Sequence, residues 1–235
     1  MLRFLNHLKP EVFEHERKFV LPTELIHETE RRLRYNPAFF REINMPIRVK
    51  SCYFDTLDLG YYWGNVDGMG RRLKVMVRSY ATSNQDTEVL PELLTSPRLE
   101  YKVKMNTQRT KIAHGCPHGD AMPTFDALWR HLQQCASMPA IMREHLMTLH
   151  PTAVIDYHRR YFRSLDGTLR LTVDTDIIYS SPNANRRVKV ETSVLELKYA
   201  RSAEASATRA AEHLRLRISR NSKYINAMNA LGQSL

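Results

Sequence analysis

The sequence predicts an α+β fold in which an antiparallel β-sheet curves into a barrel with a charged interior and helices flank its outside. Several segments alternate between apolar and charged residues, which is the two-residue period of a β-strand. The charged faces mix Lys or Arg with Asp or Glu, which favours a barrel whose charged face points inward. Segments with apolar stripes at helical spacing are available to cover the outer face. An open antiparallel sheet with its charges in water fits the same alternation.

The strands follow from this alternation. Near the N-terminus Glu14, Glu16 and Lys18 share one face, although Arg17 blurs the pattern. In 98–105 the odd positions are apolar or aromatic and the even positions are charged. Three other strands, 71–80, 168–178 and 193–199, show a similar alternation, with Met76, Tyr80 and Thr172 among the charged positions. In chain order the predicted strands are 14–20, 47–55, 71–80, 98–105, 108–113, 153–163, 168–178 and 193–199.

The helices follow from apolar residues at helical spacing and from start signals. The dipeptides Pro22-Thr23 and Pro123-Thr124 precede two such segments, and the second has Leu128, Trp129 and Leu132 on one stripe. The predicted helices are 23–35, 124–135, 139–149, 202–218 and a short one at 222–231.

Length and charge set limits on the function. The 235 residues fit one domain, 1–235, without an internal linker. With 35 Lys and Arg against 25 Asp and Glu, the net charge is +10, which predicts attraction to a polyanion. Charge alone does not distinguish nucleotides, phosphate chains, nucleic acids and anionic lipids.

Cysteine usage and hydropathy predict the compartment. Three cysteines without a pattern predict a reducing environment, and we expect a cytoplasmic protein. The segment 1–9 lacks the apolar core and cleavage site of a secretory signal. No apolar stretch reaches the roughly 18 residues that cross a bilayer. We therefore expect any peripheral association with a membrane to depend on a separate membrane protein.

The string Glu14-His15-Glu16-Arg17-Lys18 has the spacing of a metal and phosphate site. In a strand its alternate residues lie on one face about 7 Å apart. Two carboxylates can then share a hard divalent cation while the ammonium group binds a phosphate oxygen. Three alternating charges on a solvent-facing strand are the other interpretation of this string.

The string also resembles the opening motif of the triphosphate tunnel metalloenzymes, a CYTH-like superfamily. Later segments narrow the resemblance to the VTC domain, the polyphosphate polymerase part of the vacuolar transporter chaperone. They follow the order of that family over nearly the whole chain. These segments are SCYFDTLDLGYY at 51–62, RRLKVMVRSY at 71–80, LEYKVKMNTQRTKI at 99–112, YHRRYF at 157–162, LRLTVDTDI at 169–177, VLELKY at 194–199 and SKY at 222–224.

The resemblance implies an eight-stranded antiparallel tunnel with a basic lumen. It also implies ATP as substrate, Mn²⁺ or Mg²⁺ as cofactor, and transfer of the γ-phosphoryl group to a growing inorganic polyphosphate chain. The catalytic residues it implies are Lys18, Arg78, Lys102, Arg159, Arg170 and Glu196. The phosphate- or nucleotide-binding residues it implies are Arg72, Lys74, Lys104, Arg109, Lys111, Lys198 and Lys223. The metal ligands it implies are Glu14, Glu16 and Glu196, with Glu100 and Asp174 as weaker candidates.

One departure from the family pattern keeps other functions open. Met76 stands where the family usually has a phosphate-binding Arg. Besides polymerisation we therefore consider triphosphate hydrolysis, nucleotide cyclisation and a tunnel that only binds polyphosphate or another polyanion. The carboxylates likewise have two possible roles, metal ligation or pairing with the basic side chains. Because Tyr53, Tyr101 and Tyr199 fall on predicted apolar faces, we expect no specific nucleic-acid partner.

Overall fold

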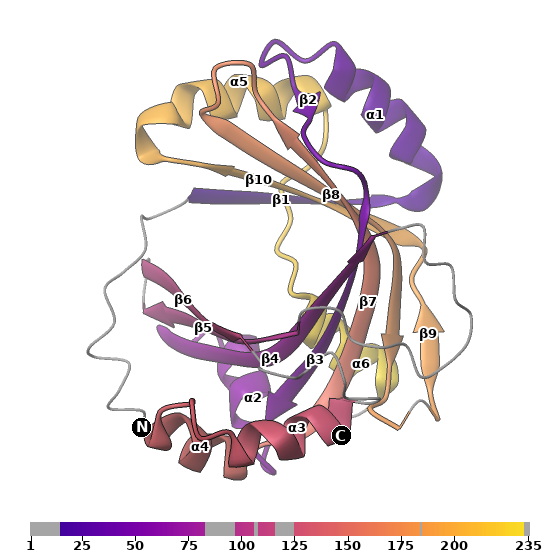
Figure 1. Cartoon of the computed structure of the whole chain (residues 1–235). Helices are drawn as coiled ribbons and strands as arrows, with labels where there is room; N and C mark the ends of the chain where they lie inside the picture. Colours follow the sequence, from indigo (N-terminus) through magenta and orange to yellow (C-terminus); the bar gives the residue numbers. More distant parts are fainter. Residues whose placement is uncertain (1–14, 83–96, 106–107, 116–124, 184, 233–235) are drawn as a thin grey trace.

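The fold is dominated by one antiparallel sheet (Figure 1). A computed structural model describes residues 15–82, 97–105, 108–115, 125–183 and 185–232. Eight strands form the main path of the sheet, in the order β1-β10-β8-β7-β3-β4-β5-β6. They are β1 (His15–Pro22), β3 (Ile47–Asp55), β4 (Arg71–Thr82), β5 (Arg98–Met105), β6 (Gln108–Gly115), β7 (His150–Arg163), β8 (Leu169–Ser180) and β10 (Thr192–Tyr199). The eight predicted strands are thus confirmed, with small shifts at their ends.

The sheet curls until its two ends face each other across an opening (Figure 1). Among the described residues no pairing joins β1 to β6, so the barrel-like sheet is not closed by hydrogen bonds there. Instead, the segment 215–219, which follows helix α5 (Glu204–Leu214), runs beside β1. The amide of Ser219 donates to the carbonyl of Lys18 at 2.7 Å, and Ile218 forms a bridge with Phe19.

Helices cover the convex face of the sheet in two groups (Figure 1). The first group is α3 (Phe125–Gln134) with α4 (Ala140–Met147), which pack Leu128, Trp129 and Leu146 on the outer face of β3, β4 and β5. The second is α1 (Ile26–Arg34) with α5 (Glu204–Leu214), which cover β1, β10 and β8. The predicted outer helices are confirmed. Short 3₁₀ turns at Thr23–Leu25 and Arg201–Ala203 precede α1 and α5.

The last helix, α6 (Lys223–Leu231), packs on the concave side of the sheet, where Lys223 bonds to Asp174. Its apolar residues join a cluster with Val49, Tyr53, Met76 and Tyr157 from β3, β4 and β7. The concave face is therefore filled by apolar packing in one part and lined by charges in the rest. The helix begins at a Ser222 cap and ends before Gly232, which has a φ of 63°.

Four elements differ from the sequence-based expectation. The predicted helix 202–218 ends at Leu214, because Arg215 adopts a left-handed conformation with φ 54° and the chain then runs beside β1. Two short strands were not expected: β2 (Arg41–Glu42) pairs with the C-terminal end of β7, and β9 (Arg187–Lys189) pairs with the C-terminal end of β8. Helix α2 (Gly60–Val66) was not expected either.

Helix α2 is fixed by a side chain outside it. Both carboxylate oxygens of buried Asp55 accept backbone hydrogen bonds at 2.8 Å, one from Thr56 and Tyr61 and the other from Tyr62. A carboxylate at the beginning of a helix satisfies its free amides and suits its dipole. A seven-residue helix that depends on such a contact has too little periodicity to be recognised in the sequence.

Candidate functional site

The charged part of the concave face brings like charges side by side. Residues directly opposite each other in an antiparallel sheet point to the same face. On β4, β5 and β6 this register places Lys74 beside Lys102 and Lys102 beside Lys111. Two residues further along the strands, the register places Arg72 beside Lys104. Because like charges directly opposite destabilise a sheet, these rows favour a bound anion.

A buried carboxylate holds part of this wall together. Glu100 on β5 is fully buried, and Arg78 on β4 exposes only 6 % of its surface. The Glu100 carboxylate lies 2.6 Å from Nζ of Lys111 and 3.5 Å from Nη1 of Arg78. Burial raises the pKa of Glu100, but Arg78, Lys102 and Lys111 outweigh it and the net pKa is lowered. Arg78 is fixed further by a bond from its Nε to Ser51 Oγ at 2.9 Å.

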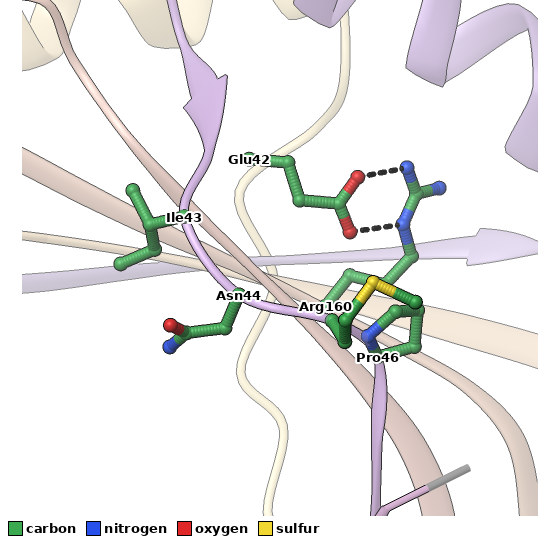
Figure 2. A pocket seen from close by; sticks show the side chains of 6 residues that line it. Glu42, Ile43, Asn44, Pro46 and Arg160 are labelled. Atoms are coloured by element: carbon green, nitrogen blue, oxygen red, sulfur yellow. Dashed lines mark hydrogen bonds and ion pairs between the residues drawn. The ribbon is translucent and has the colours of Figure 1, made fainter. Parts of the chain in front are cut away.

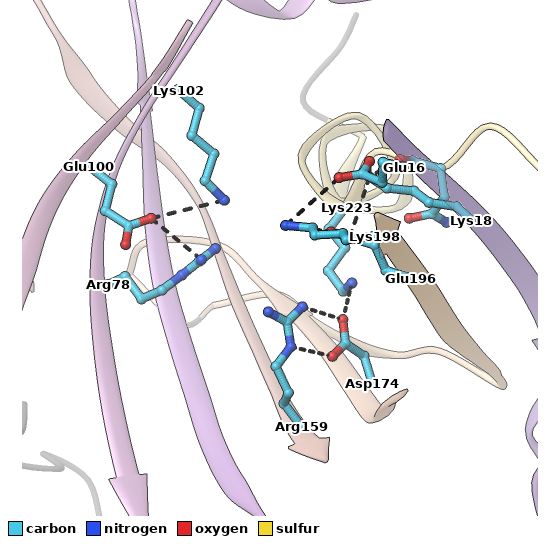
Figure 3. A network of polar contacts seen from close by, with 11 residues as sticks. Glu16, Lys18, Arg78, Glu100, Lys102, Arg159, Asp174, Glu196, Lys198 and Lys223 are labelled. Carbon is cyan, nitrogen blue, oxygen red and sulfur yellow. Dashed lines mark hydrogen bonds and ion pairs between the residues drawn. The ribbon is translucent and has the colours of Figure 1, made fainter. Parts of the chain in front are cut away.

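Lys102 reaches from this wall into the tunnel. Figure 3 shows it pointing from β5 toward the charged groups of the facing wall, and its Nζ lies 4.0 Å from the Glu100 carboxylate. Desolvation between the walls, together with the charge of Arg78, lowers the pKa of Lys102 well below its ordinary value. The side chain still exposes 42 % of its surface, so water in the tunnel moderates this shift.

The facing wall on β1 and β10 carries two carboxylates and two ammonium groups in alternation. Glu16 lies opposite Lys198, and Lys18 lies opposite Glu196. Nζ of Lys18 is 3.1 Å from Glu16 and 3.7 Å from Glu196. Nζ of Lys198 is 3.0 Å from Glu196 and 4.0 Å from Glu16. We call these four residues the Glu–Lys quartet (Figure 3).

The quartet keeps the carboxylate of Glu196 ionised. The side chain of Glu196 is 13 % exposed, and burial alone raises its pKa. The positive charges of Lys18, Lys198 and Arg159 outweigh that effect, so the pKa of Glu196 lies well below its ordinary value. A carboxylate that stays charged at neutral pH is able to bind a cation.

Between the two walls lies a third ionic group, formed by β7, β8 and α6 (Figure 3). Arg159 donates two hydrogen bonds to the fully buried Asp174, at 2.6 and 2.7 Å, and Lys223 donates a third at 2.5 Å. Burial raises the pKa of Asp174, but these two cations outweigh it and the net pKa is lowered. The ring of Tyr157 lies beneath both cations, with its centroid 5.2 Å from Cζ of Arg159 and 4.9 Å from Nζ of Lys223.

The beginning of α6 contacts all three groups. The carbonyl of Asn221 accepts from Lys18 at 3.2 Å, and the hydroxyl of Ser222 accepts from Lys74 at 2.9 Å. Lys223, the next residue, bonds to Asp174. Three consecutive residues therefore connect one wall, the other wall and the group between them, and α6 fixes the width of the tunnel at this level.

Comparisons with known proteins agree with this geometry. The model of the VTC domain matches residues 13–232. The chain belongs to the VTC domain family. Comparison with curated protein sequences gives no significant match.

Solved structures with a similar fold are distant in sequence. One is the PH1012 protein of Pyrococcus horikoshii OT3, with a TM-score of 0.52, 10% identity and coverage of 91% of this chain and 98% of that one. A second, from Vibrio parahaemolyticus and provisionally named an adenylate cyclase, has a TM-score of 0.52, 13% identity and coverage of 92% and 98%. A third is HpAC1 of Hippeastrum, described as having a dominant triphosphatase activity, with a TM-score of 0.51, 14% identity and coverage of 92% and 96%. At these identities the likeness shows a shared tunnel-like fold.

Most of the predicted site residues of this VTC domain lie on the concave face. The register and contacts above place there Glu16, Lys18, Arg72, Lys74, Arg78, Glu100, Lys102, Lys104, Lys111, Arg159, Asp174, Glu196, Lys198 and Lys223. Arg170 shares this face but is exposed at its edge, opposite Lys198. Glu14 lies outside the described residues, and of Arg109 only the backbone, paired with Lys104, is described.

Met76 belongs to the apolar part of the concave face rather than to the charged wall on β4, β5 and β6. It is fully buried among Tyr53, Tyr157 and Tyr224, and its sulfur accepts from Nη2 of Arg78 at 3.4 Å. The Met76 side chain therefore contacts Arg78 and helps to hold its guanidinium group in place.

Several site residues were not found by sequence reasoning. Ser222, Asn221 and Tyr157 contact the cations of the tunnel, yet the sequence singles out only Lys223 from the motif SKY at 222–224. The motif SKY did contain a usable signal, since a Ser before a helical segment is a typical cap.

The metal prediction has a partial fit in the quartet. The carboxylates of Glu16 and Glu196 lie on both sides of the same two ammonium groups and offer oxygen ligands. Among the described residues no three His, Cys, Asp or Glu side chains form a metal site, so at most two of them are available as ligands. Mg²⁺ is commonly bound by one or two carboxylates together with phosphate oxygens and water. Glu100 and Asp174 are instead paired with cations, which was the alternative role considered for the carboxylates.

A pocket of about 690 Å³ lies elsewhere, beside β2 (Figure 2). Its lining residues are Glu42, Ile43, Asn44, Met45, Pro46 and Arg160. Glu42 and Arg160 form a two-armed ion pair there, and no predicted site residue lines the pocket. We therefore place the candidate functional site in the tunnel. Within the described part of the chain every helix is too short or too polar to cross a lipid bilayer.

Proposed function

We propose that this VTC domain is a polyphosphate polymerase that transfers the γ-phosphoryl group of ATP to an inorganic polyphosphate chain. The observation that supports this most is the row of directly opposed cations on β4 and β5, facing a wall that contains a pair of carboxylates. The cation rows suit a chain of phosphates, and the carboxylate pair suits a divalent cation bound with it.

Phosphoryl transfer depends mainly on positioning and on neutralising charge. In the proposed reaction Lys102, Lys74 and Lys111 bind phosphate oxygens from one wall, while Lys18 and Lys198 bind them from the other. Arg159 and Lys223 contact the chain between the walls. Charges interact by about 4 kcal/mol at 4 Å where the effective dielectric constant is near 20, against about 1 in water. Confinement also aligns the acceptor phosphate with the γ-phosphorus.

The carboxylates of Glu16 and Glu196 are the residues proposed to hold Mn²⁺ or Mg²⁺. When bound, the divalent cation neutralises charge on the phosphate oxygens. The lysines of the quartet contact both carboxylates before the substrate binds, and their charge keeps Glu196 ionised, as its lowered pKa indicates. Arriving phosphate oxygens then provide new partners for these ammonium groups.

Triphosphate hydrolysis is the second candidate. The Hippeastrum protein that shares the fold is described as a triphosphatase, and a tunnel that positions a triphosphate also serves attack by water. Met76 favours this candidate mildly, because one fewer cation is present than the VTC pattern provides.

One assay separates the candidates. The purified protein is incubated with ATP and Mn²⁺ or Mg²⁺, and polymer, free phosphate and cyclic nucleotide are measured. We expect ATP-dependent formation of polymer. Phosphate alone would establish hydrolysis and cyclic nucleotide would establish cyclisation, and tight ATP binding without any product would identify a tunnel that only binds polyanions.

A further inference from the structure

A row of basic residues crosses four neighbouring strands at the edge of the concave face. Arg41 on β2 lies opposite Arg163 on β7, and Arg163 lies opposite Arg170 on β8. Arg170 in turn lies opposite Lys198 on β10. We call these four residues the basic row. Arg41 and Arg163 have no role in the site described above.

The alternation of the strands fixes the side to which the row points. Arg163 follows Arg159 by four residues on β7, so both share a face, and Arg159 bonds to Asp174 in the tunnel. Arg41 lies directly opposite Arg163 and shares that face. Its neighbour Glu42 points to the other side, where it pairs with Arg160 (Figure 2). This ion pair holds β2 against β7 and thereby positions Arg41.

The row has the properties of an anion site. Arg41, Arg163 and Arg170 are exposed, and the side chain of Lys198 is 36 % exposed. Like charges directly opposite in a sheet destabilise it, so adjacent cations on four strands gain from a ligand that neutralises them together. With strands about 4.8 Å apart, the row extends over roughly 14 Å. A compact anion covers only part of this length, whereas a linear polyanion contacts every member.

We propose that the basic row binds a run of phosphate groups in an inorganic polyphosphate chain where the chain leaves the tunnel. The inference rests on the proposed function for the identity of the ligand. Lys198 belongs to both the quartet and the row, so the row continues the lining of the tunnel without a break. Arginine presents a planar fork that matches phosphate oxygens, which suits successive contacts along such a chain.

The test measures binding without turnover, in the absence of divalent cations. Dissociation constants of the full chain are determined for long-chain polyphosphate and for tripolyphosphate at several salt concentrations. We expect Arg41→Gln with Arg163→Gln to weaken long-chain binding about tenfold and tripolyphosphate binding less than about threefold. Affinity decreases with salt, and the plot of log affinity against log salt should become less steep in the variant. Its slope should decrease in magnitude by roughly 0.7 for each phosphate group that the variant no longer neutralises, as for single-stranded polyanions.

Two control variants make the result specific. Arg201→Gln with Arg209→Gln removes the same charge from exposed positions in the 3₁₀ turn and helix at α5. Arg41→Lys with Arg163→Lys retains the charge of the row and is expected to retain most of the long-chain affinity. An equal loss in the row variant and the α5 variant, or equal losses for both ligands, would overturn the proposal.

Phosphatidylserine vesicles test an anionic lipid surface as the other source of phosphate groups. If the row variant loses vesicle binding but keeps long-chain binding, the row serves a lipid surface and the proposal is wrong. A wild-type chain that makes no polymer from ATP, yet shows row-dependent binding of long chains, would remove the proposed polymerase and leave the row as a polyphosphate site.

Discussion

At the scale of single residues, the tunnel contains two kinds of carboxylate. Glu100 and Asp174 are fully buried, and their oxygens face cations from neighbouring strands. Glu16 and Glu196 are slightly exposed and share two flexible ammonium groups. Removing a carboxylate of the first kind leaves buried cations without a partner. A carboxylate of the second kind is able to exchange its lysine partner for a metal ion, so it is the better target for a test of function.

The first prediction concerns Glu196→Ala. We expect metal-dependent activity to fall by more than about 100-fold. Mutating a residue that only hydrogen-bonds to a metal ligand already lowers metal affinity or activity by about 10- to 100-fold. The variant should lose some stability, because the ionised Glu196 contributes to it, but it should remain folded since Lys18 and Lys198 retain Glu16 nearby. Glu191→Ala, an exposed change just before the same strand, is the control and should keep full activity. Full activity of Glu196→Ala would exclude Glu196 from the site.

The second prediction contrasts Arg78→Ala with Lys102→Ala. Arg78 is 6 % exposed and contacts buried Glu100, so its removal should cost about 3–5 kcal/mol of unfolding free energy. Lys102 is 42 % exposed, and its removal should cost less than about 1 kcal/mol. Lys102→Ala should instead weaken ATP binding in a salt-sensitive manner. Urea denaturation and equilibrium binding measure the two effects, and equal stability losses would contradict the assigned burial of Arg78.

At the scale of elements, helix α6 determines whether the walls of the tunnel are held at the right separation. Its first turn provides the contacts to Lys18, Lys74 and Asp174. The helix is anchored from behind by Tyr224, whose hydroxyl donates to Asp55 at 2.6 Å and whose ring stacks on Tyr53 at 5.1 Å. Asp55 thus connects helix α2, helix α6 and, through α6, the ionic groups of the tunnel.

The third prediction tests this anchor with Tyr224→Phe. The ring remains, but a hydrogen bond to a buried carboxylate is removed, which should reduce stability by about 1.5–3 kcal/mol. We also expect KM for ATP to rise, because Lys223 and Ser222 lose their support. Tyr62→Phe removes a neutral bond to Asn229 near the other end of α6 and should cost only about 1 kcal/mol, with KM unchanged. A KM unaffected by Tyr224→Phe would show that α6 is positioned by other contacts.

The limits of sequence-based prediction also appear at this scale. The eight long strands were predictable because alternation is local and persists over several residues. Helix α2 depends on the side chain of Asp55, which precedes it, and β2 depends on pairing with β7, so neither leaves a periodic signal of its own. The same applies to the site. Alternation placed the charges on one face, but the pairing of Glu100 with Lys111 depends on the register between strands.

At the scale of the whole molecule, the tunnel is a network of charges within a protein of net charge +10. Three of its carboxylates, Glu100, Asp174 and Glu196, have lowered pKa values because cations from other elements outweigh the effect of their burial. The elements joined in this way include β1, β7, β10 and α6. The stability of the curved sheet is therefore coupled to the ionisation of its lining, which leads to a prediction about pH.

The fourth prediction is a loss of stability in acid. A carboxylate with a lowered folded pKa stabilises the protein above its unfolded pKa and loses this effect as pH falls toward the folded value. The ordinary values are 4.5 for Glu and 3.8 for Asp, so we expect Tm to stay level from about pH 8 to about pH 5 and to fall steadily below that. Asp174→Asn should lower Tm at neutral pH and make the acid decline shallower, because one of the three groups no longer titrates. Thermal unfolding followed by circular dichroism measures both curves. A wild-type Tm that stays level to about pH 3, or parallel curves for the two proteins, would show that these ion pairs do not stabilise the sheet.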